Sequence, residues 1–365
     1  MTIRVMNGCD MGSTQAIGWQ LAGCTIGRDT STDSFSSSTP VYTGRRYARF
    51  TWGSSSEWRV DFGTGKFTGD TIWGGFWWKT NSLRNQSANT ILGIHRGGST
   101  WVSGGTHSAA FSVFSIQWAG NYSENYQCRD ANNADVGDGF RMAEGTWYYI
   151  SFEVSATGTG NLTVKVNGKT VCNNVASDYA GTSATGDQYS FALIPRSTHE
   201  FDDFIFGDGA GSINNGIPDI SFVQPIWPDA DDSNTGYTTL LPTTPVDRYS
   251  KINEQGSQDD DTSYCDTAAL SDEYTVTLGN LGTTPVSGGV HAYQQIQRAR
   301  RSSGVDTVTL RNRLKSGTTY YNGTDKVTGD AYVNVNDFWE LDPDTGPAAW
   351  DATGINQIRA SGIMV

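Results

Sequence analysis

Two consecutive stretches of alternating residues, 147–155 and 160–171, constrain the fold of this 365-residue chain more than any other feature. In the first stretch, one set of alternate positions is apolar: Tyr148, Ile150, Phe152 and Val154. The second stretch repeats the pattern, and Asn167-Gly168 within it can adopt the positive φ angles of a tight hairpin turn. Because successive strand side chains point to opposite faces, the two stretches predict half-buried strands at the edge of a β-sandwich.

The composition favours an all-β fold. The chain contains 12 Trp, 16 Tyr and 15 Phe, whose rings pack well on pleated surfaces, and 43 glycines that supply turns between short strands. Its length exceeds the usual size of one domain. We therefore expect two β-rich domains.

The first domain is predicted over residues 1–212. Trp58, Val60 and Phe62 alternate with polar residues, whereas residues 72–78 are apolar on both faces, as in a central strand that is covered on each side. Further candidate strands are 48–52, 91–94, 111–118, 189–194 and 201–206. Many short strands without a convincing helix indicate an antiparallel sandwich or jelly roll.

The second domain is predicted over residues 213–365, after a stretch at 207–218 that is rich in glycine and asparagine. Residues 274–278 and 307–314 alternate as strands do, and Asn322-Gly323 is a second hairpin signal. One short helix is expected from Asp351, as N-cap, to Gln357, followed by a strand at 358–365. The pattern predicts a smaller C-terminal β-sandwich with one short helix.

Charge disfavours nucleic acid as a partner, since the formal net charge is -13. Residues 298–315 are a basic exception, with six Arg and Lys residues against Asp306 alone. Aromatic residues do not interleave with these basic residues as they do in a nucleic-acid platform. We therefore expect no nucleic-acid binding.

Cysteine usage indicates reduced thiols, because the five cysteines form no CxxC pair. The N-terminus lacks the apolar segment of a secretory signal, and no apolar run approaches the length of a membrane span. The chain is therefore expected to be made and folded in a cytoplasm, without insertion into a membrane.

Residues 1–212 resemble the concanavalin A-like jelly roll in its laminin-G-like form. The resemblance rests on Arg46-Tyr-Ala-Arg-Phe50, on Thr71-Ile-Trp-Gly-Gly-Phe-Trp-Trp-Lys79, on the Trp147 strand with its Asn167-Gly168 hairpin, and on Phe201-Asp-Asp-Phe-Ile-Phe206. It implies a fold. That fold serves lectins, glucanases, adhesion modules and viral proteins alike, so it does not choose a function.

Motifs in the C-terminal part are similar to those of tailed-bacteriophage virion proteins, in which a laminin-G-like half precedes a β-rich half. They are Ile226-Trp-Pro-Asp-Ala-Asp231, Asp259-Asp-Asp-Thr-Ser-Tyr264, Ala299-Arg-Arg301, Trp339-Glu-Leu-Asp-Pro-Asp-Thr-Gly346 and Ala349-Trp-Asp-Ala-Thr-Gly-Ile-Asn356. The resemblance implies a virion structural protein, assembled in the host cytoplasm with other virion proteins and with copies of itself, a trimer being one option. A tail, baseplate or fibre component is favoured over a capsid decoration protein.

Catalytic residues are not evident in the sequence. Glu200 and Asp202 could share a strand face as the carboxylates of β-glucanases do, but Phe204 is expected at the next position on that face, where an acid would be needed. The four histidines are scattered and have no zinc-ligand spacing. The sequence therefore predicts a protein that is not an enzyme.

Asp229, Asp231 and Asp232 bring several carboxylate oxygens close together in sequence, as a calcium-binding loop does. They lack the terminal Glu and the flanking helices of an EF-hand. A solvated acidic turn is the favoured alternative, so we expect no cofactor, with calcium as the weaker option.

The basic residues Arg298, Arg300, Arg301, Arg311 and Arg313 allow three interpretations. They can form a solvated face, pair with the acidic cluster at 259–261 in the same domain, or dock on an acidic surface of a neighbouring subunit.

Trp101, Tyr122 and Tyr126 lie in polar, loop-like segments, and aromatic rings in such places can stack on sugars. Loop aromatic residues also anchor protein interfaces, or fall in loops by chance. A carbohydrate-binding protein that recognises a host-surface polysaccharide is accordingly the alternative function.

Overall fold

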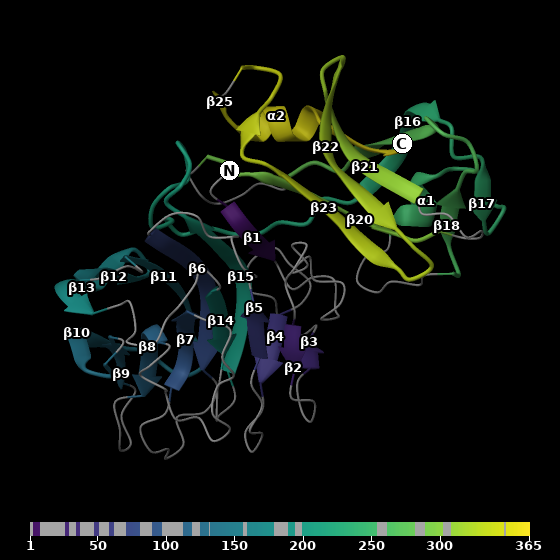
Figure 1. Ribbon diagram of the computed structural model, residues 1–365. Coiled ribbons are helices and arrows are strands. Elements are labelled where there is room, and N and C mark those ends of the chain that lie inside the picture. Colours follow the sequence, from purple (N-terminus) through teal and green to yellow (C-terminus); the bar gives the residue numbers. More distant parts are fainter. Residues whose placement is uncertain are drawn as a thin grey trace. The chain divides into compact units, whose positions relative to one another are not determined.

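The computed structural model is nearly all β and divides into two compact units, Met1–Val223 and Gln224–Val365 (Figure 1). The structure describes residues 3–7, 26–28, 34–36, 47–50, 58–61, 71–80, 90–96, 112–118, 125–130, 132–155, 159–178, 189–193, 199–253, 261–281, 289–301, 308–346 and 348–365.

Unit 1 consists of two antiparallel sheets that stack face to face (Figure 1). The eight-stranded sheet has the order β13 (Lys169–Asp178), β12 (Thr159–Val166), β11 (Trp147–Ser155), β6 (Thr71–Thr80), β15 (His199–Asp208), β4 (Tyr47–Phe50) and β3 (Ser34–Ser36), with β1 (Ile3–Asn7) also on β15. The seven-stranded sheet has the order β10 (Asp135–Arg141), β9 (Asn125–Arg129), β8 (Ser112–Trp118), β7 (Thr90–Arg96), β14 (Tyr189–Leu193), β5 (Trp58–Asp61) and β2 (Ile26–Arg28). This arrangement confirms the predicted all-β sandwich.

The core of unit 1 is formed by the inner faces of both sheets. Phe76 on β6 packs against Phe191 of the opposite sheet at 5.8 Å and stacks on Phe204 at 5.7 Å between ring centroids. Ile150, Phe152 and Val154 of the alternating stretch that begins at residue 147 are fully buried in the same cluster. The period-two pattern of the sequence therefore marks the core face correctly.

The outer face of β6 is covered by the segment that follows β15. Trp77 Nε1 donates to the Ser221 carbonyl at 3.1 Å, and the Trp77 ring stacks on Phe222 at 5.4 Å. The Ile217 backbone N–H donates to Glu153 Oε2 at 2.9 Å. These contacts confirm that residues 72–78 form a strand covered on both faces. They also extend unit 1 to Val223, beyond the division predicted after residue 212.

A β-bulge in β15 changes the faces predicted for its C-terminal half. The register against β6 shifts between Asp202 and Ile205, and Asp203 has a φ of 50°. Phe204 therefore joins Phe201 in the core, where their rings stack at 6.5 Å. The expectation that Phe204 shares a face with Glu200 and Asp202 is wrong, because an extra residue at the bulge reverses the alternation.

Unit 2 is built on a five-stranded antiparallel sheet. Its order is β16 (Pro228–Thr235), β19 (Glu273–Leu278), β26 (Arg359–Met364), β21 (Val308–Ser316) and β22 (Thr319–Thr328). Three two-stranded sheets are also present: β20 (Tyr293–Ala299) with β23 (Val333–Trp339), β17 (Thr239–Leu241) with β18 (Tyr264–Asp266), and β24 (Leu341–Asp342) with β25 (Ala348–Ala349). The C-terminal unit is therefore β-rich, as predicted.

Two short helices accompany these strands, where the sequence predicted one. Helix α2 (Ala352–Gln357) begins at the expected N-cap, since Asp351 accepts a hydrogen bond from the Gly354 N–H at 2.6 Å. Helix α1 (Tyr249–Ile252) was not predicted. It is a single turn. The N–H of its first residue, Tyr249, is capped by a residue far away in sequence, since it donates to the Asp231 carboxylate at 2.8 Å.

A buried polar network joins the five-stranded sheet to the two-stranded sheet of β20 and β23. Asn312 is fully buried and donates to the Val335 carbonyl at 3.0 Å and to Asp337 Oδ2 at 3.1 Å. The Gln295 amide donates to the Ser361 carbonyl at 2.8 Å. Burial raises the pKa of Asp337 above its ordinary value, although hydrogen bonds from Thr324 and Asn312 oppose the shift. The network links β20, β21, β23 and β26, so it fixes their register as well as their packing.

We predict that Gly74→Ala destabilises the protein by about 1–3 kcal/mol, the usual cost of overpacking a core. A Cβ atom at this position would lie 2.3 Å from Cδ1 of Phe206 and 2.8 Å from Cζ of Phe152. Urea unfolding of the full chain measures the effect. Gly329→Ala is the control, because a Cβ there meets nothing within 4 Å. Equal stability of the two variants would contradict the close packing of β6.

Candidate functional site

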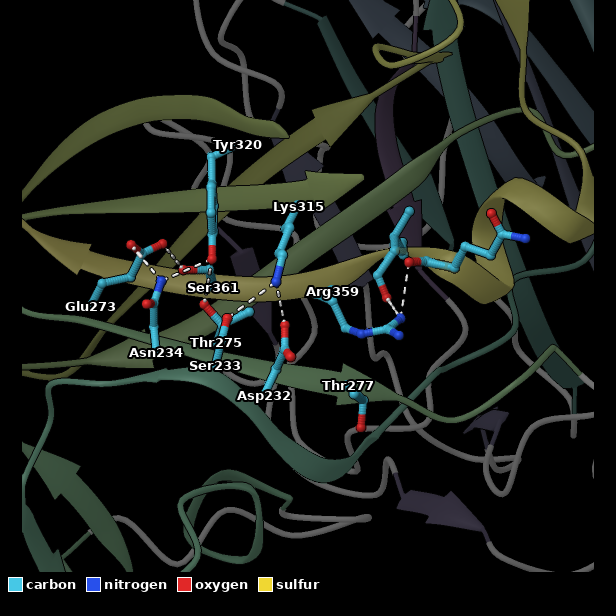
Figure 2. Close-up of polar contacts among 12 residues, drawn as sticks. Asp232, Ser233, Asn234, Glu273, Thr275, Thr277, Lys315, Tyr320, Arg359 and Ser361 are labelled. Atoms are coloured by element: carbon cyan, nitrogen blue, oxygen red, sulfur yellow. Dashed lines mark hydrogen bonds and ion pairs between the residues drawn. The ribbon is translucent and has the colours of Figure 1, made fainter. Parts of the chain in front are cut away.

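The first candidate surface is the outer face of the five-stranded sheet in unit 2 (Figure 2). Lys315 Nζ forms an ion pair with Asp232 Oδ2 at 2.7 Å and donates to Ser233 Oγ at 3.2 Å. The Tyr320 ring lies beside two cations, 4.4 Å from the Arg313 guanidinium and 5.6 Å from Lys315 Nζ. We call this surface the ion-pair face; its members are Asp232, Asn234, Glu273, Arg313, Lys315, Tyr320 and Ser361.

Glu273 lies at the centre of the ion-pair face. Its Oε2 accepts from Arg313 Nη1 and from Asn234 Nδ2, each at 2.9 Å, and its Oε1 accepts a short hydrogen bond from the Ser361 hydroxyl. Asn234 also donates to the Tyr320 hydroxyl at 2.8 Å. The carboxylate thus accepts hydrogen bonds from three other strands of the same sheet and links them through charge-assisted contacts.

Electrostatics on the ion-pair face favour the charged state of both members of the Lys315–Asp232 pair. The hydrogen bond to Asp232 raises the pKa of Lys315. Partial burial opposes ionisation of Asp232, but the hydrogen bond and charge of Lys315 outweigh it and lower the pKa of this carboxyl.

The predicted arginines pair within the chain. Ion pairs join Arg300 to Asp261, Arg301 to Asp330, Arg311 to Asp325 and Arg313 to Glu273. The Arg298 guanidinium lies 4.6 Å from the centre of the Tyr332 ring. Pairing with the acidic cluster is therefore confirmed for Arg300, whereas docking of these arginines on a neighbouring subunit stays a prediction.

The predicted acidic turn with Asp229, Asp231 and Asp232 is a strand, β16, and each of its three carboxylates contacts a different partner. Asp231 accepts from the backbone of Arg248 and Tyr249, Asp232 pairs with Lys315, and Asp229 accepts from the Thr277 hydroxyl. Across the described part of the chain, no three His, Cys, Asp or Glu side chains are close enough together to hold a metal ion. Calcium binding by Asp229, Asp231 and Asp232 stays a prediction.

Glu200, Asp202 and Asp203 are nearly inaccessible to solvent, at 1%, 1% and 3% exposure. Glu200 forms an ion pair with Lys79 of the neighbouring strand, and Asp202 accepts a hydrogen bond from the Asp203 N–H at 2.9 Å. His199, at the start of β15, is fully buried, which lowers its pKa to about 3, and its Nδ1 accepts from Trp78 Nε1 at 3.1 Å. These groups hold β15 against β6.

Of the predicted glycan-contact residues, the structure describes Tyr126, and its ring is buried. Tyr126 lies in β9 and is 1% exposed, with its ring 4.7 Å from Trp78 and 5.5 Å from Phe140. The expectation that Tyr126 stacks on a sugar is wrong, because its polar neighbours in sequence point to the opposite face of the strand and leave its ring in the core. Trp101 and Tyr122 lie outside the described residues.

A second candidate surface consists of those polar neighbours on the outer face of β8, β9 and β10. Gln117 pairs across the sheet with Gln127, and Asn125 pairs with Arg141. Directly opposite residues in antiparallel strands share a face, so these side chains and that of Arg129 lie together, away from the core. We call this surface the amide–arginine platform; its members are Gln117, Asn125, Gln127, Arg129 and Arg141.

The platform side chains are held in place by neighbouring groups. Arg141 Nε donates to Asn125 Oδ1 at 2.7 Å, and Gln117 Nε2 donates to Asn133 Oδ1 at 2.8 Å. Arg129 Nε pairs with Asp135 Oδ1 at 2.8 Å. Exposure increases from Gln117, which is 5% exposed, toward Arg141, which is exposed to solvent. The sequence carried a signal for this surface, the alternation Asn-Tyr-Gln-Cys-Arg at 125–129, but it did not show which strands flank it.

No protein-family model matches the chain, and no curated protein matches it. Solved structures do match its fold. The carbohydrate esterase vb_24B_21 from Shiga toxin-encoding bacteriophage phi24B is 12% identical, with a TM-score of 0.40 over 56% of this chain and 98% of its own. The alginate lyase Aly36B is 9% identical, with a TM-score of 0.39 over 56% of this chain and 96% of its own.

The carbohydrate recognition domain of Emp46p is 8% identical, with a TM-score of 0.38 over 56% of this chain and 96% of its own. At such identities these likenesses concern the fold alone. They nevertheless overturn the prediction that the protein is not an enzyme, because similar structures include an esterase and lyases as well as a recognition domain. Among the described residues, no helix is long and apolar enough to cross a membrane.

We predict that Lys315 and Asp232 stabilise unit 2 jointly by about 1 kcal/mol at neutral pH, a typical coupling for a partly exposed ion pair. A double-mutant cycle with Lys315→Met and Asp232→Asn measures it through urea unfolding. The folded-state pKa of Asp232 is below its unfolded value. The coupling is therefore present above the unfolded pKa and is lost as the pH falls through the folded-state pKa.

The Arg311–Asp325 pair is the comparison for this cycle. Its side chains are more exposed, at 26% and 48%, than those of Lys315 and Asp232, at 17% and 25%. We expect a smaller coupling there, because solvent screens the charges more strongly. A coupling between Lys315 and Asp232 that is absent at neutral pH, or unchanged in acid, would contradict the assigned ion pair.

Proposed function

We propose that the protein is a component of a tailed-bacteriophage particle and that its N-terminal jelly roll binds a polysaccharide of the host surface. The amide–arginine platform is the observation that carries the binding part of this proposal. The particle part is supported by the resemblance of the C-terminal motifs to virion proteins. A position in the tail, baseplate or fibre is preferred to capsid decoration on the same resemblance.

The chemistry of the platform suits a carbohydrate. Side-chain amides donate and accept hydrogen bonds at once, so they match the hydroxyl groups of a sugar, and guanidinium groups bind hydroxyl pairs or carboxylates through two N–H groups. Gln127 and Arg129 are half-buried and their neighbours hold them in position. Groups ordered before binding lose less conformational entropy when a ligand arrives.

The Gln127 side chain lies over the backbone of the neighbouring strand, where its Nε2 donates to the Val136 carbonyl at 3.0 Å and to the Gly137 carbonyl at 3.2 Å. The strand opposite Gln127 carries Gly137 and Gly139, both with positive φ angles, at a shift of register between β9 and β10. Glycine has no side chain, and the Gln127 amide occupies that room, since a Cβ atom on Gly139 would lie 2.8 Å from Gln127 Oε1. An extended chain of sugars fits such a surface, on which several weak hydrogen bonds add up.

The C-terminal motifs contribute to the hydrophobic core of unit 2. Trp350 is 1% exposed and donates from Nε1 to the Trp339 carbonyl at 2.7 Å. Ile355 of the final motif is 2% exposed in the same cluster. These residues therefore stabilise unit 2. We place contacts with other particle proteins, or with further copies of this chain, on the surface of that unit.

We predict that Arg141→Ala weakens binding of the full chain to its best oligosaccharide about tenfold, the effect of losing one charge-assisted hydrogen bond of about 1.4 kcal/mol. Binding is measured on an array of neutral and uronate-containing bacterial surface oligosaccharides, followed by titration calorimetry. Arg311→Ala is the matched control, an arginine on a strand of unit 2 that also has a polar partner. Equal affinity of Arg141→Ala and the control would remove the platform as the site.

The particle part of the proposal has a separate test. Mass spectrometry of purified particles of the virus that encodes the chain should detect it, and labelling with an antibody should place it on the tail. Absence from the particles would refute the particle role without bearing on the platform. Labelling of the capsid surface would favour a decoration protein instead.

A further inference from the structure

Cys128 and Cys172 face each other across the sandwich of unit 1. Cys128 lies in β9 of the seven-stranded sheet and Cys172 in β13 of the eight-stranded sheet, and both belong to the buried core cluster. Each is 1% exposed. The Cys172 side chain is the largest influence on the pKa of the Cys128 thiol, which it raises, so the two side chains lie near each other. The residues lie 44 positions apart in sequence and on different sheets, so only the closure of the sandwich brings them together.

Backbone geometry at the neighbouring strand shows independently how close the two sheets are here. Val136 pairs with Cys128 in the β9–β10 ladder, and the next residue, Gly137, touches the backbone of β13. A Cβ atom on Gly137 would lie 2.8 Å from Cβ and 2.9 Å from Cα of Cys172. Glycine at this position, with a φ of +75°, therefore lets the edge of one sheet approach the other sheet at Cys172.

We propose that Cys128 and Cys172 are a site of oxidative cross-linking, at which a disulfide joins the two sheets of the jelly roll. The oxidant is a low-molecular-weight disulfide. One cysteine thiolate attacks it, so that a mixed disulfide forms and one small thiol leaves. The second cysteine thiolate then attacks the mixed disulfide, the Cys128–Cys172 bond forms, and the second small thiol leaves. Two protein thiols are oxidised and one external disulfide is reduced.

The position of the pair gives the cross-link a structural effect. β13 is the outermost strand of its sheet, and β9 is the last strand but one of the opposite sheet, next to β10. A disulfide there ties together the free edges of the sandwich, on the side where the amide–arginine platform lies. It also closes a loop of 45 residues, counted from Cys128 to Cys172 inclusive, which restricts the unfolded chain.

Burial controls when the bond can form. The neighbouring Cys172 side chain and burial both raise the pKa of Cys128, so the thiol is protonated and reacts slowly while the sandwich is closed. Reaction therefore requires the edge strands to open, or takes place during folding before the sheets close. For the same reason the finished disulfide is shielded from external thiols, and we expect reduction of the native protein to be slow.

The test compares the full chain after equilibration in reduced and in oxidised glutathione. Non-reducing tryptic mapping should identify a linkage between peptides 97–129 and 170–196, which contain Cys128 and Cys172. Thermal unfolding of the oxidised protein should occur on the order of 10 °C higher, from the entropy of a loop of this length. This comparison uses the wild-type chain, so it does not depend on whether a cysteine variant folds.

Variants provide the controls. Cys265→Ser changes a thiol in unit 2 and should leave both the linkage and the rise in melting temperature intact. Cys172→Ala should abolish both. Recovery of Cys128 and Cys172 as alkylated free thiols after oxidation and unfolding would overturn the proposal. So would an oxidised protein that carries the linkage but melts at the same temperature as the reduced one. Linkages that involve only other cysteines would also overturn it.

Discussion

The pairing of β6 with β11 and β15 is the constraint on which the rest of unit 1 depends. β6 is buried over almost its whole length, so both of its faces must be covered by other parts of the chain. The inner face packs on the aromatic cluster of the second sheet, and the outer face accepts Phe222 and Ser221. Gly74 and Gly75 permit this double coverage, because a side chain at either position would collide with an aromatic ring. Because the outer face of β6 must be covered, the segment after β15 packs on it. This segment therefore belongs to unit 1, which extends to Val223.

Two kinds of polar surface result from the sandwich architecture, and they differ in what remains available to a ligand. On the ion-pair face each charged group has a partner from a neighbouring strand, as Glu273 and Lys315 show. A ligand on this face would have to displace existing ion pairs. On the amide–arginine platform most partners are neutral: Gln127 donates to backbone carbonyls of β10, Arg141 donates to the Asn125 amide, and Gln117 donates to Asn133. This difference is why we place binding on unit 1.

Much of the fold could be predicted from the sequence, because alternation of apolar residues reports burial directly. The strands at 147–155 and 72–78 and the cap at Asp351 are local signals of this kind. The bulge at Asp203 could not be predicted, because a positive φ at a residue other than glycine is imposed by the neighbouring strand. Residues 228–235 have the composition of a turn, and they form a strand only because β19 supplies the hydrogen bonds. The platform was missed because it depends on cross-strand register, which a single sequence does not show.

The central claim is that carbohydrate binds at the amide–arginine platform. Hydrogen–deuterium exchange of the full chain, with and without its best-binding oligosaccharide, tests it most directly. The account predicts slower exchange in peptides that cover Ser112–Trp118 and Asn125–Arg141, with no change across the ion-pair face at Val308–Thr328. Protection confined to unit 2, or equal exchange throughout the chain despite saturating ligand, would contradict it.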